Sequence, residues 1–146
     1  MEAIILAGGF GTRLQHVVAD VPKPMAPIGK KPFLGYILDN LIEHGIDKVV
    51  LAVGYKKNEI IDYFAASYRN VEILYSPEDT PLLTGGAIKK ALTLCKEQQV
   101  FVINGDTFFE VDLQKMAEFH KQHESMLTIA TKKMSCFERY GTVVTR

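Results

Sequence analysis

The sequence of 146 residues has no excess of either charge, because lysine plus arginine and aspartate plus glutamate both number 17. A protein that binds nucleic acid concentrates basic residues on one face, so this balance gives no support for a nucleic-acid partner. Cysteine is scarce as well. Cys95 and Cys136 form neither a metal-ligand spacing nor a disulfide framework. Reduced thiols in the cytoplasm are therefore expected.

Long apolar segments are missing too. The N-terminal apolar run covers five residues, 3–7, and it follows Glu2 without the basic region or cleavage site of a signal peptide. No segment approaches the roughly 18 uninterrupted apolar residues of a membrane helix. These absences predict a soluble, cytoplasmic protein without a membrane partner.

What the chain does contain is a regular alternation of two patterns. Short runs rich in Val, Ile and Leu predict buried strands at 2–7, 47–54, 71–75 and 100–104. Apolar residues at helical spacing predict helices at 33–44, 58–68, 86–97 and 112–124, with Gly45 ending the first, Asn58 capping the second and Asp112 opening the fourth. The alternation predicts one α/β domain over residues 1–146. Its sheet would be Rossmann-like, doubly wound, mixed but mainly parallel, with helices on both faces.

Two further strand-like runs, 126–131 and 141–145, close the sequence. The chain then stops at Arg146 without a terminal helix or polar tail, so the natural domain is expected to continue. A last strand left at an exposed sheet edge would favour self-association into a homo-oligomer.

The densest glycine cluster follows the first predicted strand, in the sequence Leu6-Ala-Gly-Gly-Phe-Gly-Thr-Arg-Leu14. Gly8, Gly9 and Gly11 carry no Cβ and permit positive φ, so their backbone N–H groups can converge on an anion. Arg13 adds a planar guanidinium that suits two phosphate oxygens. The segment predicts a phosphate-binding loop for a nucleoside triphosphate.

Two common phosphate-loop families fit this segment poorly. The dinucleotide fingerprint needs a third glycine where the chain has Leu14, and an acidic residue about 20 positions later is missing. The Walker motif needs Lys-Ser or Lys-Thr after its last glycine, whereas Thr12 and Arg13 follow Gly11 here. A glycine turn without a ligand is the remaining alternative.

Lys23 stands between two prolines, Pro22 and Pro24. The prolines are expected to hold it in an extended, pre-ordered segment. A lysine fixed in this way can neutralise charge that develops on a phosphoryl group. Alone, such a lysine is more often a solvated loop residue, but its place shortly after the glycine loop favours a catalytic role.

Two more motifs lie where a strand ends and where a helix begins. Asn104-Gly105-Asp106 directly follows the apolar run 100–103. The Asp106 carboxylate is therefore expected at the ligand-binding edge of the sheet, where it could hold Mg²⁺. Thr84-Gly85-Gly86-Ala87 opens a predicted helix, and its glycines would let a flat base lie against the backbone. The alternatives are a plain turn for the first motif and a helix cap at Thr84 for the second.

Together these motifs resemble those of the sugar-1-phosphate nucleotidyltransferases, also called nucleotide-sugar pyrophosphorylases. The resemblance covers nearly the whole chain and is carried by residues 6–14, Lys23-Pro24, Gly85-Gly86-Ala87-Ile88 and Asn104-Gly105-Asp106. Within the family, residues 24–27 and 84–88 look most like the guanylyltransferases. These act on mannose 1-phosphate or on D-glycero-D-manno-heptose 1-phosphate, and the heptose branch is the closer resemblance.

The resemblance implies a nucleotidyltransferase fold and an enzyme that joins GTP to a sugar 1-phosphate. The products would be a nucleotide sugar for surface polysaccharide synthesis and pyrophosphate. The sugar phosphate would attack the α-phosphorus in line, with Mg²⁺ as cofactor and without a covalent enzyme intermediate. The same chemistry with UTP, dTTP or CTP, and a non-catalytic module that binds a nucleotide or nucleotide sugar, remain alternatives.

The resemblance also implies individual roles. Arg13 would bind the β and γ phosphates, Lys23 would stabilise the α-phosphoryl group, and Asp106 would ligate Mg²⁺. Gly141 matches a family glycine near the sugar phosphate. The rest of the nucleotide site would comprise Leu6 and Ala7 beside the base, Gly8, Gly9, Gly11 and Thr12 around the triphosphate, and Gly85 and Gly86 in the base pocket.

The chain departs from the family pattern in two places. Relatives usually have glycine where this chain has Leu83. The family's second metal-binding aspartate and most of its sugar contacts lie in a later segment that this chain lacks, so Mg²⁺ binding would be weak and the chain alone could be inactive. The four histidines are expected on solvated faces rather than at a metal: His16, His44, His120 and His123.

Overall fold

The computed structural model describes residues 1–9, 21–135 and 141–144. The chain divides into two compact units, Met1–Phe108 and Phe109–Arg146. Each unit is described by itself, and the single domain expected over residues 1–146 stays a prediction.

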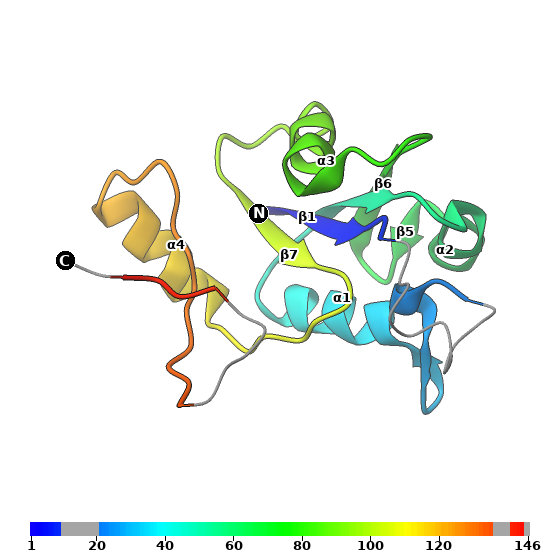
Figure 1. Cartoon of the computed structure of the whole chain (residues 1–146), viewed down its shortest axis with the longest axis horizontal. Helices are drawn as coiled ribbons and strands as arrows, with labels where there is room; N and C mark the ends of the chain where they lie inside the picture. The colour runs from blue at the N-terminus through cyan, green and yellow to red at the C-terminus, as the bar shows by residue number, and fades with distance from the viewer. Residues whose placement is uncertain (10–20, 136–140, 145–146) are drawn as a thin grey trace. The chain divides into compact units, whose positions relative to one another are not determined.

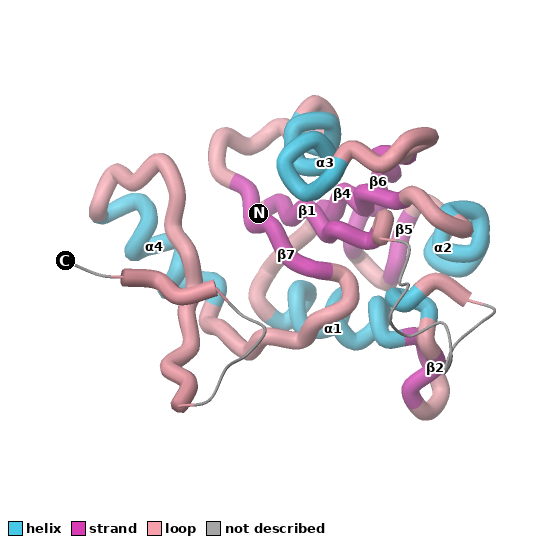
Figure 2. The backbone as a smooth tube through the Cα atoms, in the orientation of Figure 1, coloured by secondary structure: helices cyan, strands magenta, loops and turns pink. Residues whose placement is uncertain are grey.

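The first unit is built on a five-stranded sheet with the strand order β5-β6-β4-β1-β7 (Figure 2). The parallel strands are β1 (Glu2–Ala7), β4 (Lys48–Val53), β6 (Val71–Pro77) and β7 (Val100–Asn104). The short strand β5 (Ser67–Tyr68) runs antiparallel to β6. The expected mixed, mainly parallel sheet is confirmed, and all four predicted strands are present.

Helices cover both faces of this sheet. In Figure 1, α3 (Leu83–Leu92) lies on one side of the strands and α1 (Phe33–Glu43) on the other. A strand covered on both faces has no solvent-facing side, so its sequence is apolar throughout rather than alternating. This explains why β4 is buried at every position.

The connections between strands place a crevice at one edge of the sheet. The chain passes from β1 to its neighbour β4 and on to β6, and it then returns to place β7 against the other side of β1. The strand order therefore reverses between β1 and β7. In doubly wound sheets ligands bind at the carboxyl ends of the strands where this reversal occurs.

The first two helices partly follow the prediction. Gly45 has φ +80° just past the end of α1, as expected of a glycine that ends a helix. In contrast, α2 (Lys57–Phe64) begins before Asn58, and Lys56 precedes it in the left-handed conformation. The expected N-cap at Asn58 is therefore wrong. The helix also stops short of residue 68, because Ser67 and Tyr68 pair with β6 as strand β5.

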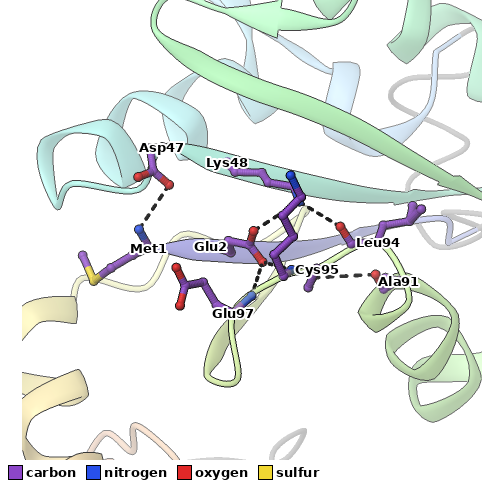
Figure 3. A network of polar contacts seen from close by, with 9 residues as sticks. Met1, Glu2, Asp47, Lys48, Ala91, Leu94, Cys95 and Glu97 are labelled. Carbon is purple, nitrogen blue, oxygen red and sulfur yellow. Dashed lines mark hydrogen bonds and ion pairs between the residues drawn. The ribbon is translucent and has the colours of Figure 1, made fainter.

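The third helix begins and ends earlier than the predicted range 86–97. The residues expected to form its last turn belong instead to a buried polar network (Figure 3). The backbone N–H groups of Lys96 and Glu97 donate to Glu2 Oε2 at 2.8 and 3.1 Å, and Lys48 Nζ lies 3.1 Å from Glu2 Oε1. Because Glu2 binds these two amides, they cannot continue the hydrogen bonds of α3.

The short elements between β1 and α1 complete the first unit. They are the 3-10 turn η1 (Lys23–Met25) and the two-stranded antiparallel ribbon of β2 (Pro27–Ile28) and β3 (Lys31–Pro32). Among the helices that the structure describes, none is both long and apolar enough to span a membrane.

The second unit contains α4 (Leu113–Gln122). Asp112 caps it as expected, since its side chain accepts a hydrogen bond from Lys115 N at 3.0 Å. The predicted strands at 126–131 and 141–145 are wrong for the residues described, up to 144. A strand requires a hydrogen-bonded neighbour, and the described strands offer none to these runs. Met126 and Leu127 are exposed instead.

Candidate functional site

A cavity of about 380 Å³ lies at the carboxyl edge of the sheet in the first unit. The end of β1 and the residues after it line one part, and the segment after β7 lines another. The cavity thus brings together six of the predicted catalytic, nucleotide-binding and metal-binding residues: Leu6, Ala7, Gly8, Gly9, Lys23 and Asp106.

Lys23 and Asp106 meet at this cavity. Lys23 Nζ lies 3.3 Å from Asp106 Oδ2, and both side chains are partly exposed. Lys23 is not extended as predicted, because it begins the 3-10 turn η1, which a hydrogen bond from Met25 N to Pro22 O closes. The N–H groups in the first turn of a helix make no hydrogen bonds within the helix, so Pro24 is tolerated there. The prolines are therefore compatible with a helical turn as well as with the extended segment that was predicted.

Glycines let the ends of three strands come very close together. A Cβ on Gly54, after β4, would lie 2.8 Å from the carbonyl oxygen of Gly8, and one on Gly105 would lie 2.9 Å from the carbonyl oxygen of Leu6. Gly105 N also donates to that Leu6 oxygen at 2.9 Å. Among the described residues, no atom would lie within 4 Å of a Cβ on Gly9, in the predicted phosphate loop.

Glu78 is a lining residue that the sequence analysis did not single out. Its backbone N–H extends the β6 edge by donating to Val53 O at 2.7 Å, and its Oε2 accepts from Leu82 N at 3.0 Å. Its Oε1 would lie 3.4 Å from a Cβ on Gly8. The carboxylate therefore reaches from the end of β6 across to the end of β1.

The loop that carries Glu78 is fastened from both sides. Lys57 Nζ, at the start of α2, donates to Asp79 Oδ1 at 2.9 Å. This hydrogen bond and the charge of Lys57 hold the pKa of Asp79 below its usual value. Lys90 of α3 donates to the Pro77 carbonyl oxygen. These contacts hold the backbone on either side of Glu78, although Glu78 itself was not part of a recognisable motif.

The start of α3 forms another part of the cavity wall. Thr84 and Ala87 of the predicted base-binding motif line the cavity, together with Leu83. Leu83 has φ +59° and is 82% exposed. Bulky side chains rarely adopt the left-handed region, which costs about 1–2 kcal/mol relative to the right-handed one.

A comparison with protein-family models assigns the chain to a family. Residues 2–146 match the model described as nucleotidyl transferase. The chain belongs to the nucleotidyl transferase family. Two curated relatives, both D-glycero-alpha-D-manno-heptose 1-phosphate guanylyltransferases, are 56% identical over all of this chain (Aneurinibacillus thermoaerophilus) and 50% identical over 98% of it (Campylobacter jejuni). The chain spans 64% and 62% of the length of these relatives.

Solved structures confirm the nucleotidyl transferase fold. HddC from Yersinia pseudotuberculosis, solved in complex with GMP-PN, is 41% identical and has a TM-score of 0.75, over 82% of this chain and 53% of that one. UDP-glucose pyrophosphorylase from Acinetobacter baumannii has a TM-score of 0.74 at 20% identity, over 85% of this chain and 53% of that one, and it shows the fold alone.

Some predicted site residues of this nucleotidyl transferase chain lie elsewhere. Gly85 and Gly86 are next to the lining residues of α3, and a Cβ on Gly86 would lie 2.9 Å from Leu82 Cβ, so this glycine also serves the packing of the loop. Gly141 is exposed and lies in the second unit. Gly11, Thr12 and Arg13 lie outside the described residues.

The donor set at the cavity fits a divalent cation that phosphates help to hold. Glu78 and Asp106 are the carboxylates among the described lining residues. The described part of the chain brings no three metal-binding side chains together. Mg²⁺ commonly binds one or two carboxylates plus substrate phosphates rather than an all-protein cage. Asp106, which lines the same cavity as Gly8 and Gly9, suits that mode of binding.

Proposed function

We propose that the protein transfers a guanylyl group from GTP to D-glycero-D-manno-heptose 1-phosphate and releases pyrophosphate. The family of the chain and the activity named for its two bacterial relatives support this proposal. The observation that carries it is the pairing of Lys23 with Asp106 beside Gly8 and Gly9. A cation and a carboxylate next to a phosphate-binding loop are the groups that phosphoryl transfer chemistry needs.

The proposed reaction is an in-line displacement at phosphorus. A phosphate oxygen of the sugar 1-phosphate attacks the α-phosphorus of GTP, and the bond between this phosphorus and the bridging oxygen of the β-phosphate breaks. Pyrophosphate leaves with that oxygen and its electron pair. Because the nucleophile is already an anion, no side chain has to remove a proton from it. The protein contributes alignment and charge neutralisation.

Charged and backbone groups of the chain divide this work. Lys23 would contact the α-phosphoryl group, and Arg13 would contact the β and γ phosphates that leave. The backbone N–H groups of the loop from Gly8 to Thr12 would bind the triphosphate oxygens. Asp106 would hold Mg²⁺ together with the phosphates, and the ion would supply further neutralisation of their charge.

Glu78 supports guanine as the base. Guanine presents two adjacent donors, N1–H and the N2 amino group, and a carboxylate can accept from both. The bases of UTP, dTTP and CTP offer no such pair of neighbouring donors. Glu78 reaches the cavity beside Gly8. Leu6, Ala7, Gly85 and Gly86 would complete the base pocket.

Fewer residues of this chain are assigned to the sugar 1-phosphate, which accepts the guanylyl group. Gly141 would contact the sugar phosphate, and the relatives extend well beyond the length matched here. The nucleotide sugar would serve polysaccharide synthesis in the cytoplasm, where Cys95 would remain a free thiol, as it is in the structure. Self-association and the lack of a nucleic-acid partner stay predictions.

Pyrophosphate release tests the proposal. The protein is incubated with Mg²⁺, each of GTP, UTP, dTTP and CTP, and either mannose 1-phosphate or the heptose 1-phosphate. We expect the fastest release with GTP and the heptose. If GTP binds but no pair releases pyrophosphate, the chain is a nucleotide-binding module instead. If none of the four nucleotides binds, the site has been assigned wrongly.

A further inference from the structure

Leu83 opens α3 in a conformation that leucine rarely adopts. Its φ is +59°, and the residue is 82% exposed, so it adds almost nothing to the core. A glycine would adopt this backbone without strain. Residues with a strained backbone that have no packing role are often found at ligand sites. There the side chain contacts the ligand rather than the protein core.

The strand order separates Leu83 from the end of the cavity that holds Asp106. α3 follows β6, Asp106 follows β7, and β4 and β1 lie between those two strands. Three spacings between neighbouring strands amount to about 14 Å. The cavity therefore has one end with the apolar side chains of Leu83 and Pro81 beside the Glu78 carboxylate, and another end with Lys23 and Asp106. An elongated ligand with phosphates at one end and a flat ring with polar edges at the other fits this distribution.

We propose that Leu83 covers the nucleobase, with its side chain packed on the face of the guanine ring of bound GTP. This inference rests on the proposed function and adds to it a residue that positions the base. Leu83 both lines the cavity and remains exposed, which places it at the mouth. Binding would bury apolar surface that the free protein leaves in water. Glu78 would select the base by its edge, while Leu83 holds the ring by its face.

Three variants distinguish the effect of the Leu83 side chain on GTP binding from the effect of its backbone conformation. Leu83→Gly and Leu83→Asn both tolerate the left-handed conformation but remove the apolar side chain. Leu83→Met restores apolar area. Leu92→Asn is the matched control, since Leu92 is a half-exposed leucine at the other end of the same helix. The dissociation constant for GTP with Mg²⁺ and the melting temperature are measured for each.

We expect Leu83→Gly and Leu83→Asn to weaken GTP binding about fivefold or more while the melting temperature stays equal or rises. Leu83→Met and Leu92→Asn should bind like the unchanged protein. Equal or tighter GTP binding by Leu83→Gly would overturn the inference but leave the proposed function intact. Failure of the unchanged protein to bind GTP would instead overturn the proposed function.

A spectroscopic measurement tests the contact directly. Protein with isotope-labelled leucine methyl groups is titrated with GTP and, separately, with inorganic tripolyphosphate, and the Leu83 signals are assigned by their loss in Leu83→Met. A methyl group on the face of an aromatic ring is shifted upfield, so GTP should shift the Leu83 methyls and tripolyphosphate should not. Leu83 methyl signals unmoved by saturating GTP would contradict the contact.

Discussion

Lys23 and Asp106 come together from segments 83 residues apart, with 3.3 Å between Nζ and Oδ2. Their side chains are 25% and 45% exposed, and partly exposed ion pairs contribute only about 0–1 kcal/mol to stability. The ion pair therefore breaks at little cost when either residue finds a stronger partner. The lysine can bind a phosphate and the carboxylate can bind a divalent cation. Both side chains already lie at the cavity.

Lys23→Met is expected to separate these two roles. Pyrophosphate release should fall by about 100-fold or more, because a positive charge is lost where negative charge develops. Binding of Mn²⁺ without nucleotide should become tighter, since Asp106 is no longer paired. The first effect is measured by steady-state assay and the second by electron paramagnetic resonance of Mn²⁺.

Lys30→Met is the control for Lys23→Met, since Lys30 is an exposed lysine in the turn between β2 and β3. It should change neither measurement. If Lys23→Met binds Mn²⁺ no more tightly than the unchanged protein does, the lysine does not compete with a cation for Asp106.

Glu78→Gln is expected to relax the choice of nucleobase. A glutamine side chain presents one acceptor and one donor, so it can no longer accept from both N–H groups of guanine. Affinity for GTP should fall about 10-fold or more relative to UTP, because a charge-assisted contact is lost. Competition binding with the four nucleotides measures this ratio. Glu43→Gln, at the exposed end of α1, should leave it unchanged. An unchanged ratio in Glu78→Gln would mean that Glu78 does not contact the base.

The sequence predicts those residues of the site that follow the ends of strands. Gly8, Gly9 and Asp106 follow apolar runs directly, and the carboxyl ends of parallel strands meet at one edge, so their convergence needed no knowledge of the loops. Glu78 was missed because its place depends on how the loop after β6 turns back toward β1, which local sequence does not encode. The wrong N-cap at Asn58 and the misplaced start of α3 have a similar origin. Lys56 directly before α2 and Leu83 at the first position of α3 both have positive φ, against ordinary side-chain preference.

Two glycine variants should distinguish a packing role from a binding role. Gly54→Ala would place a Cβ 2.8 Å from the Gly8 carbonyl oxygen, a backbone atom, so the phosphate loop or β4 must shift. We expect a loss of about 1–3 kcal/mol in the free energy of unfolding, together with weaker GTP binding. The Cβ of Gly9→Ala would meet no atom of the described residues within 4 Å, so the stability of this variant should be unchanged while GTP binding weakens. Urea denaturation and calorimetric titration of both variants provide the measurements. Equal stability of Gly54→Ala and the unchanged protein would contradict the close approach.

The buried network at the other end of the sheet predicts a dependence of stability on pH. Glu2 and Lys48 are nearly fully buried. Burial alone would raise the pKa of Glu2, but hydrogen bonds from the Glu97 and Lys96 amides, together with Lys48, outweigh it and place the pKa below its ordinary value of 4.5. A carboxylate with a lowered folded-state pKa stabilises the protein above the unfolded-state pKa. That stability is lost as the pH falls through the folded-state value.

Glu2→Gln should therefore lower the free energy of unfolding by about 3 kcal/mol at pH 7, because it leaves the Lys48 ammonium buried without its partner. The difference between variant and unchanged protein should shrink as the pH falls below 4.5 toward the lower folded-state pKa, since protonation of Glu2 then favours the unfolded state of the unchanged protein. Urea denaturation between pH 3 and pH 7, run at about the same ionic strength throughout, measures both quantities. Glu72→Gln provides the matched control, because Glu72 is an exposed glutamate in β6 of the same sheet and should have little effect. A difference that stays constant over this pH range would show that the charge of Glu2 does not stabilise the fold.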